Sequence, residues 1–584
     1  MINRLLLTTN AYFYKVKKPI SKAAIKRILT LASGNKDGNA VYNEVRQLLN
    51  VGGEDLKVSF IVFKREVPPS FLVPGKEMEI HYNYLFLLEY DHYLIISRKG
   101  TEEFQEAIEK KVTFLSYQEV TSLKITPTTQ FTKVGVTNMD TTATAMRRTV
   151  WEAQDVKTIL SPLSTSNKIV TSLKLKDKGQ NTSVAPNTSR INDLGRRRDI
   201  KNFCYWVAVQ CKEIDRFKPK DTYLNDFAEA LDFRSHIKDL KVVSILFNLS
   251  PILEGLEDQS IAGIYFLDRS SRSRDIDLKP LTETHDFCMD VLYIKGSKTY
   301  SIQNNFDKTL SLRQLTGGFV IRSEKLDRVN IMYATGESIS LLDLINRDHL
   351  YIISFNNADI RFSGRTLFKD SRLLKDIPLF LQSFETQNFL SSIKSEKGKC
   401  TSTSKKFDPA SLFNSIESKL SADCSFLFCD DLGNEWADYI GFKENQFIRF
   451  YHAKYSKKQF SASAFQDLVS QALKNLGNFN FNQNLDAKKA KVNKMYSGTK
   501  IKRLRKGSTR TCMKELEATF NYPKTMKEVV LVINFLSKSE LDSQLKLLAK
   551  GKAKKETVQI LWLLSSLFSE CLQRGIIPRV ISKP

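Results

Sequence analysis

Three residues with the chemistry for phosphate-ester hydrolysis lie close together near the C-terminal third of the chain. Asp438 lies in one segment of strand-forming residues, and His452 and Lys454 lie in the next. Side chains two positions apart on a strand share a face, so His452 and Lys454 are expected to point the same way. A carboxylate and an imidazole can bind a divalent cation, and an amine can orient water or stabilise charge on a phosphate. The pattern therefore predicts metal-assisted hydrolysis of phosphodiester bonds.

A predicted β-hairpin must position these side chains. Residues 436–442 and 447–455 are rich in aromatic and β-branched types, and the polar residues 443–446 between them suit a turn. The hairpin would place Asp438 on its first strand and the other two residues near the end of its second. Further predicted elements are a helix over 411–420, a strand over 425–429 and a helix over 461–476.

The order of these elements resembles a known superfamily. Helix, strand, strand with an Asp, strand with x-x-Lys, and helix is similar to the PD-(D/E)XK, or restriction-endonuclease-like, nucleases over residues 407–479. Within that superfamily, the phrases CDDLGNEWADYIGF, FYHAKYS and SQALKN are similar to nuclease modules of bacterial anti-phage proteins. The resemblance implies a mixed central sheet flanked by helices and an active site at the hairpin.

The resemblance also implies roles for particular residues. Asp438 would be a metal ligand, and Lys454 would orient the attacking water or stabilise the transition state. His452 would be a second metal ligand or a water-positioning group. Glu417 would assist from the first helix, and the second helix would carry Gln471. The expected cofactor is Mg²⁺ or Mn²⁺.

One position departs from the family pattern. The family usually has Glu or Asp two residues before the Lys, whereas this chain has His452. Imidazole is neutral and softer than carboxylate, which leaves metal affinity and metal choice open. Asp430, Asp431 and Glu435 are alternatives for the acidic role, although Asp431-Leu-Gly is more typical of a turn.

The charge balance points to a polyanionic partner. The chain has a formal net charge of +25, and residues 485–510 hold ten cations against one acid, Asp486. Such a stretch predicts a phosphate-contacting surface, with a solvated basic loop as the alternative. Tyr496 within it could stack on a base. The residues expected to contact nucleic acid are Gln471, Lys488, Lys489, Lys502, Arg503 and Arg505.

Length and composition predict several domains. A chain of 584 residues with 42% hydrophobic content can bury more than one core. We expect an α+β N-terminal domain over 1–198 and a strand-rich α+β middle domain over 199–391. A Ser/Lys/Thr-rich linker over 392–406 would precede an α/β restriction-endonuclease-like domain over 407–584. Residues 1–391 contain no motif that predicts a specific chemistry.

The cysteines and the termini bear on the compartment. Eight cysteines lie at irregular spacings without a zinc-binding pattern, which favours a reducing cytoplasm over a disulfide framework. The N-terminus lacks the apolar core of a signal peptide, and the most apolar run, 560–568, is too short to cross a bilayer. We therefore expect a cytoplasmic protein without a membrane partner.

Together these features lead to one hypothesis and two alternatives. The hypothesis is a Mg²⁺-dependent endonuclease that cleaves DNA as the effector of a bacterial anti-phage system, with residues 1–391 sensing or regulating. One alternative is a degenerate nuclease fold that binds nucleic acid or a partner protein without catalysis. The other is an RNase. A partner protein encoded nearby and a homo-oligomer are both compatible with the sequence.

Overall fold

The computed structural model describes the chain except for residues 1–3, 35–39, 70, 72–76, 110, 140–147, 161, 258, 269–271, 278–286, 434, 481–484 and 549. Two compact units result: Met1–Thr137, Arg148–Leu160 and Ile169–Asn225 form the first, and Asn138–Arg147, Ser161–Lys168 and Asp226–Pro584 form the second. Both are rich in β-sheet, as the sequence predicts. No helix in the described ranges is long and apolar enough to cross a membrane.

The first unit is built on one large sheet with the strand order β3-β4-β5-β6-β2-β12-β11-β10-β8-β9, and β7 pairs with β2. Helix α5 packs on this sheet, because Phe203 contacts Phe86 and Trp206 contacts Phe13 at ring-centroid distances of 5.6 and 5.7 Å. The predicted domain boundary at residue 198 therefore falls inside the first unit. The strands are β2 (Asn10–Val16), β3 (Ala40–Val51), β4 (Glu54–Val67), β5 (Glu79–Tyr90), β6 (Tyr93–Lys99), β7 (Val112–Phe114), β8 (Gln130–Asn138), β9 (Arg148–Glu152), β10 (Lys168–Asp177), β11 (Gln180–Ala185) and β12 (Arg190–Leu194), and the helices include α1 (Lys22–Ala32), α3 (Tyr117–Ser122) and α5 (Ile200–Asp215).

The second unit begins with two further sheets. Their orders are β14-β26-β25-β24-β15-β18-β19-β20-β21 and β17-β16-β22-β23. Both contribute to one apolar core, in which Ile245, Leu312, Ile331 and Ile353 are fully buried. The strands are β14 (Glu229–Leu231), β15 (Val242–Phe247), β16 (Ile261–Leu267), β17 (Ser273–Asp275), β18 (Cys288–Tyr293), β19 (Thr299–Ile302), β20 (Ser311–Gln314), β21 (Phe319–Arg322), β22 (Val329–Tyr333), β23 (Ser338–Ser340), β24 (Tyr351–Phe355), β25 (Ile360–Ser363) and β26 (Thr366–Lys369), with helices α7 (Ser250–Glu257), α10 (Leu341–Asp348) and α11 (Ile377–Gln382).

The C-terminal part of the second unit contains a mixed sheet, as predicted. Its order is β27-β33-β32-β30-β29-β28-β31, with the first four strands parallel and the rest antiparallel. The predicted hairpin is confirmed, because β29 pairs with β30 from Tyr439↔Tyr451 to Lys443↔Phe447. The strands are β27 (Phe384–Thr386), β28 (Phe426–Cys429), β29 (Tyr439–Lys443), β30 (Phe447–Lys454), β31 (Leu504–Lys506), β32 (Met526–Ser537) and β33 (Ile576–Lys583).

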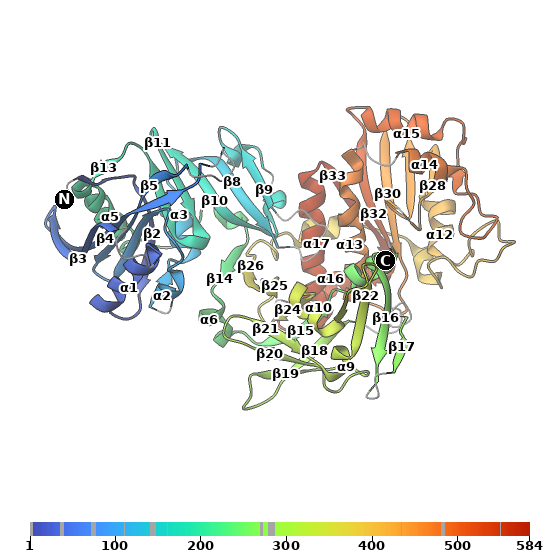
Figure 1. Cartoon of the computed structure of the whole chain (residues 1–584). Coiled ribbons are helices and arrows are strands. Elements are labelled where there is room, and N and C mark those ends of the chain that lie inside the picture. The colour runs from blue at the N-terminus through green and yellow to red at the C-terminus, as the bar shows by residue number, and fades with distance from the viewer. Residues whose placement is uncertain are drawn as a thin grey trace. The chain divides into compact units, whose positions relative to one another are not determined.

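Helices cover both faces of this sheet (Figure 1). Helices α13 and α17 pack against each other and against β30 and β33 on one face. Helix α12 and the π-helical turn η7 pack on the other face, over Tyr439, Tyr451, Val530 and Val532. Because both faces are covered, β32 is an almost continuous apolar run. The helices are α12 (Leu412–Ser415), η7 (Ile416–Leu420), α13 (Ala462–Asn475), α14 (Leu485–Val492), α15 (Cys512–Asn521), α16 (Lys538–Leu548) and α17 (Lys555–Gln573).

The segment predicted as a linker, 392–406, is part of this sheet domain instead. Strand β27, which precedes it, pairs with β33. Within the segment, Ser395 forms a bridge with Ser411, and the carbonyl of Ser404 accepts a hydrogen bond from the amide of Lys500 at 3.0 Å. The linker prediction is therefore wrong, because a Ser/Lys-rich composition does not reveal backbone pairing with distant segments.

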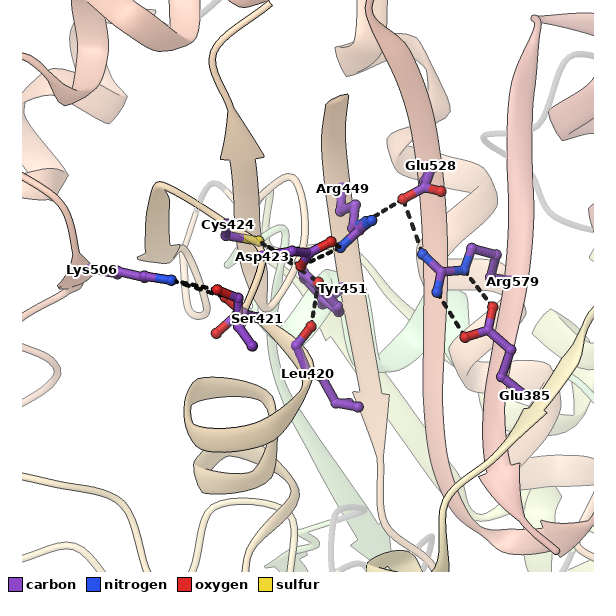
Figure 2. Close-up of polar contacts among 11 residues, drawn as sticks. Glu385, Leu420, Ser421, Asp423, Cys424, Arg449, Tyr451, Lys506, Glu528 and Arg579 are labelled. Carbon is purple, nitrogen blue, oxygen red and sulfur yellow. Dashed lines mark hydrogen bonds and ion pairs between the residues drawn. The ribbon is translucent and has the colours of Figure 1, made fainter. Parts of the chain in front are cut away.

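A chain of ion pairs crosses the parallel strands near their N-terminal ends (Figure 2). Arg449 on β30 contacts Asp423 at 2.7 Å and also pairs with Glu528 on β32. Arg579 on β33 contacts Glu528 at 3.1 Å and Glu385 on β27 at 2.6 Å. The side chains of Arg449 and Glu528 are only 11% and 8% exposed, so this central pair is screened little by water. The network ties four strands together.

We predict that Glu528→Ala lowers the free energy of unfolding by about 3 kcal/mol, because it leaves two partly buried guanidinium groups without their shared partner. The matched control is Asp423→Ala, which removes an acid from one end of the network. The Asp423 side chain is 51% exposed, so its loss should cost about 1 kcal/mol or less. Urea denaturation followed by circular dichroism measures both values. Equal unfolding midpoints for the two variants would contradict the prediction.

Candidate metal centre

The β29–β30 hairpin places Asp438 beside His452 and Lys454. Asp438 immediately precedes β29, and one oxygen of its carboxylate accepts a 2.6 Å hydrogen bond from the backbone amide of Ala453. Ala453 lies between the other two residues on β30, so the carboxylate is fixed at the end of the strand that carries them. Asp438 is only 4% exposed. The three residues that the sequence predicts to act together therefore lie at the same end of the hairpin.

Two further acids join Asp438. Carboxylate oxygens of Asp431, Glu435 and Asp438 all lie within 4.8 Å of one another. Asp431 and Glu435 belong to the loop between β28 and β29, which folds back because the amides of Asp430 and Asp431 donate to the carbonyl of Asp438 at 2.9 and 3.3 Å. The sequence analysis named both acids as alternatives for the acidic role, but it did not predict that they would converge on Asp438.

Neighbouring groups hold the two loop acids in place. The carboxylate of Asp431 accepts a hydrogen bond from the hydroxyl of Tyr496 at 2.6 Å and forms an ion pair with Lys397 at 2.7 Å. Glu435 accepts from the side-chain amide of Gln471 at 2.7 Å. These contacts orient the acids toward Asp438 rather than toward solvent.

The electrostatics of the cluster fit a bound cation. Burial raises the pKa of Asp438 well above its ordinary value, and the charges of Asp431 and Glu435 raise it further, while Lys397 opposes them. A divalent ion could replace the proton that these carboxylates would otherwise share. Carboxylate oxygens are the ligands that Mg²⁺ and Mn²⁺ prefer. The three acids therefore fit a hard divalent cation.

His452 is buried and neutral. Neither ring nitrogen makes a hydrogen bond of normal geometry within the described part of the chain. Burial lowers the pKa of His452 to about 3, and the approach of Gln471 only partly opposes this. A neutral imidazole can bind a metal or position a water, whereas a pKa this low makes it a poor proton acceptor. The ring nitrogens of His452 are not among the ligand atoms that lie within 4.8 Å of one another in the acid cluster. The cluster therefore gives no support to the prediction that His452 is a second metal ligand.

Lys454 carries a charge at the edge of the site. Its ammonium lies 3.6 Å from the carboxylate of Asp467, and about a third of its side chain is exposed. Burial lowers the pKa of Lys454, but the carboxylates of Asp467, Glu396 and Asp438 outweigh burial, and the pKa is raised. The protonated amine can stabilise negative charge on a phosphate, whereas it cannot act as a general base.

Helix α13 supplies the residues that face β30. Its N-cap Ser461 accepts a hydrogen bond from the amide of Ala464, and its apolar residues are buried at helical spacing. Asp467 and Gln471 are four residues apart and so share a helix face. Gln471 was predicted from sequence to contact nucleic acid. Asp467 was missed, and its spacing from Gln471 is the signal that could have revealed it.

Glu417 lies apart from the acid cluster. Both of its carboxylate oxygens bind Arg505, at 2.6 and 2.9 Å, and one also accepts from the hydroxyl of Tyr439 at 2.8 Å. The carboxylate that was predicted to assist catalysis is therefore occupied by a guanidinium. Arg505 was predicted to contact nucleic acid, but its guanidinium binds Glu417 instead.

Two more of the predicted nucleic-acid contacts lie inside the protein. Lys488 is 1% exposed, and its ammonium pairs with the carboxylate of Asp430. Burial lowers the pKa of Lys488 to about 8, although Asp430 opposes this effect. Arg503 is also buried and donates to the carbonyls of Cys429 and Asp431 at 3.1 and 2.8 Å. These cations stabilise the acidic loop, so the prediction that they form a phosphate-binding surface is wrong.

Of the remaining residues predicted to contact nucleic acid, the two lysines are exposed and the aromatic residue is buried. Lys489 and Lys502 are exposed. Tyr496 is 6% exposed and hydrogen-bonded to Asp431, so it is not placed to stack on a base. Lys397 was missed because it lies in the segment that the sequence predicts to be a linker.

Comparison with known proteins gives no relatives. No protein-family model, no curated protein and no solved structure matches this chain.

We predict that the protein binds one Mn²⁺ ion at the acid cluster and that Asp438→Asn weakens binding at least tenfold, because the substitution removes the carboxylate shared by the group. Isothermal titration calorimetry measures both affinities. Asp423→Asn is the matched control, since it removes the same charge from an exposed position in the same sheet domain. Equal Mn²⁺ affinity for Asp438→Asn and the control would contradict a metal centre here.

Proposed function

We propose that the protein is a metal-dependent endonuclease that hydrolyses phosphodiester bonds of DNA. The observation that carries this proposal is the convergence of Asp431, Glu435 and Asp438 beside the protonated amine of Lys454. Three carboxylates suit a divalent cation, and an adjacent ammonium suits the negative charge of a phosphate. Acids are costly to bury, so their convergence at the end of a hairpin favours a site that a cation occupies.

The fold also supports a restriction-endonuclease-like domain. Helix α12 precedes the antiparallel strands β28, β29 and β30, and α13 leads on toward β32, which is parallel to β30. The acid immediately precedes β29 and the Lys ends the neighbouring strand β30. This is the order of elements on which the resemblance to PD-(D/E)XK nucleases rests.

In the proposed reaction each side chain has one task. The acid cluster would hold Mg²⁺ or Mn²⁺, which polarises the phosphate and lowers the pKa of a bound water. Lys454 stabilises the charge that develops as the water oxygen bonds to phosphorus and the bond to the leaving sugar oxygen breaks. His452 is neutral, and its lowered pKa makes it a weak base, so it would position the attacking water, whose proton passes to solvent.

We further propose a role in bacterial defence against phage, with residues 1–391 sensing or regulating cleavage. This part rests on the similarity of the phrases around Asp438 and Lys454 to nuclease modules of anti-phage proteins. Neighbouring genes that form a defence cluster would support it, and genes of unrelated metabolism on both sides would speak against it.

A second candidate is a non-catalytic nucleic-acid-binding protein with a degenerate nuclease fold. Two observations favour it: His452 stands where the family has an acid, and the ammonium of Lys397 already neutralises Asp431 at 2.7 Å. Nicking assays separate the candidates, because a degenerate site would bind DNA without cleaving it under any metal.

We predict that Lys454→Ala and Asp438→Ala each reduce cleavage of supercoiled plasmid at least 100-fold with Mg²⁺ or Mn²⁺, because each removes a charge that the transition state requires. Gel electrophoresis of the products measures the rate, and circular dichroism checks that the variants fold. Lys457→Ala is the control, since Lys457 is exposed three residues away.

Unchanged cleavage in both site variants would refute the active site. A parallel assay with single-stranded RNA tests the RNase alternative, and preferential cleavage of RNA would replace DNA as the substrate.

A further inference from the structure

The cations near the metal centre separate into two groups. One group points inward: Lys397, Lys488, Lys491, Arg503 and Arg505 bind acids or carbonyls of the domain. The other group is exposed and consists of Lys399, Lys405, Lys406, Lys494, Lys500 and Lys502. Within the described ranges, the ammonium groups of this second group form no hydrogen bond or ion pair with the protein. Their positive charge is therefore balanced only by solvent ions or by a partner.

The exposed lysines come from two segments that lie side by side. Residues 397–406 and 494–502 are nearly one hundred positions apart in sequence. Even so, the amide of Lys500 donates to the carbonyl of Ser404 at 3.0 Å. Phe407 packs edge-on against Tyr496 with ring centroids 5.1 Å apart. A bridge between Met495 and Lys502 closes the second segment on itself. The two segments thus form one continuous structure, which we call the lysine surface.

The lysine surface borders the metal centre. Lys397 in the first segment and Tyr496 in the second both reach the carboxylate of Asp431. One inward-pointing side chain of each segment thus binds Asp431 of the acid cluster. The exposed lysines of the same segments point to solvent. Neither segment contains an acidic residue, and Glu396 immediately precedes the first. A polyanion lying on this surface would reach the site without meeting a row of negative charges.

The surface also lacks groups that stack on bases. The only aromatic residue in the two segments is Tyr496, which is buried. Proteins that grip single strands combine positive charge with exposed aromatic platforms, whereas a duplex can be held through its phosphates alone. The chemistry of the surface therefore favours a double-stranded backbone and contact without sequence readout.

We propose that the lysine surface binds the phosphodiester backbone of duplex DNA and holds it against the metal centre. The inference deepens the proposed nuclease function by naming the surface that delivers the substrate. It differs from the sequence prediction, because Lys488, Arg503 and Arg505 are replaced by lysines of the segment that was predicted to be a linker. Binding itself does not depend on cleavage, so the two proposals can fail separately.

The test removes four charges from the surface and four from elsewhere. The surface variant is Lys405→Gln, Lys406→Gln, Lys500→Gln and Lys502→Gln, and the control is Lys238→Gln, Lys295→Gln, Lys298→Gln and Lys308→Gln. All eight lysines are exposed and belong to the second unit. Each variant replaces four lysines, so both lower the net charge equally. Fluorescence anisotropy with a labelled 30-base-pair duplex, in EDTA to prevent cleavage, measures affinity across a salt series.

The surface variant should lose at least tenfold in affinity at 0.1 M salt. Its slope of log affinity against log salt should become shallower by about 4, roughly one for each of the four lost phosphate contacts. The control should bind within about twofold of the unchanged protein. Equal losses of affinity in both variants would show that only the overall charge matters. That result would overturn the proposal that the lysine surface binds DNA.

Single-stranded arms complete the test. Labelled 30-nucleotide DNA and RNA should bind about tenfold more weakly than the duplex, because the surface offers no stacking group. Single strands that bind as tightly as the duplex would overturn the preference for double-stranded DNA. If the duplex binds as expected but no metal supports nicking, the nuclease proposal fails while the lysine surface stands.

Discussion

The C-terminal domain is organised around the cost of burying carboxylates. The loop between β28 and β29 carries four acids into or beside the protein interior, where an unpaired charge is strongly unfavourable. Asp430 is fully buried and paired with two lysines, Lys488 and Lys491. The carboxylate of Asp431 pairs with Lys397 and accepts a hydrogen bond from Tyr496. Asp438 accepts a hydrogen bond from a backbone amide, but burial and the repulsion of Asp431 and Glu435 outweigh the opposing charge of Lys397 and raise its pKa. The compensation is thus incomplete at one point, and that point is where a cation fits.

This compensation explains why the basic stretch is divided. From its sequence, a segment with ten cations and one acid could be a surface for phosphates or a solvated loop. In the structure, only some of these cations are exposed, and the others are paired inside the domain. Some of its cations, such as Lys488 and Arg503, hold the acidic loop closed from inside. Others, such as Lys494 and Lys500, stay exposed. The same segment therefore supports the geometry of the metal centre and provides charge at its border, so net charge alone could not separate these roles.

The sequence predicted the local elements well because local patterns specify them. The hairpin, helix α13 and the apolar strand β32 follow from β-forming residues, a Ser N-cap and continuous hydrophobicity. The pairings of side chains were not predictable in this way. Glu417 meets Arg505 across 88 positions, and Lys397 meets Asp431 from a segment whose composition is typical of a linker. Such contacts depend on how distant strands and loops stack, and a single sequence does not encode them as a pattern.

Strand β30 shows how packing and chemistry are specified together. Its side chains alternate, so Tyr451 and Ala453 enter the apolar core under α12, while His452 and Lys454 face α13. A shift of one residue in register would turn the Lys toward the core under α12 and move the Tyr out of that core toward α13. The pairing of Arg449 with Glu528 at the opposite end of the strand opposes such a shift, because it would separate two partly buried charges. The alternation that makes β30 a good central strand is therefore the same property that aims two chemically active side chains at one face.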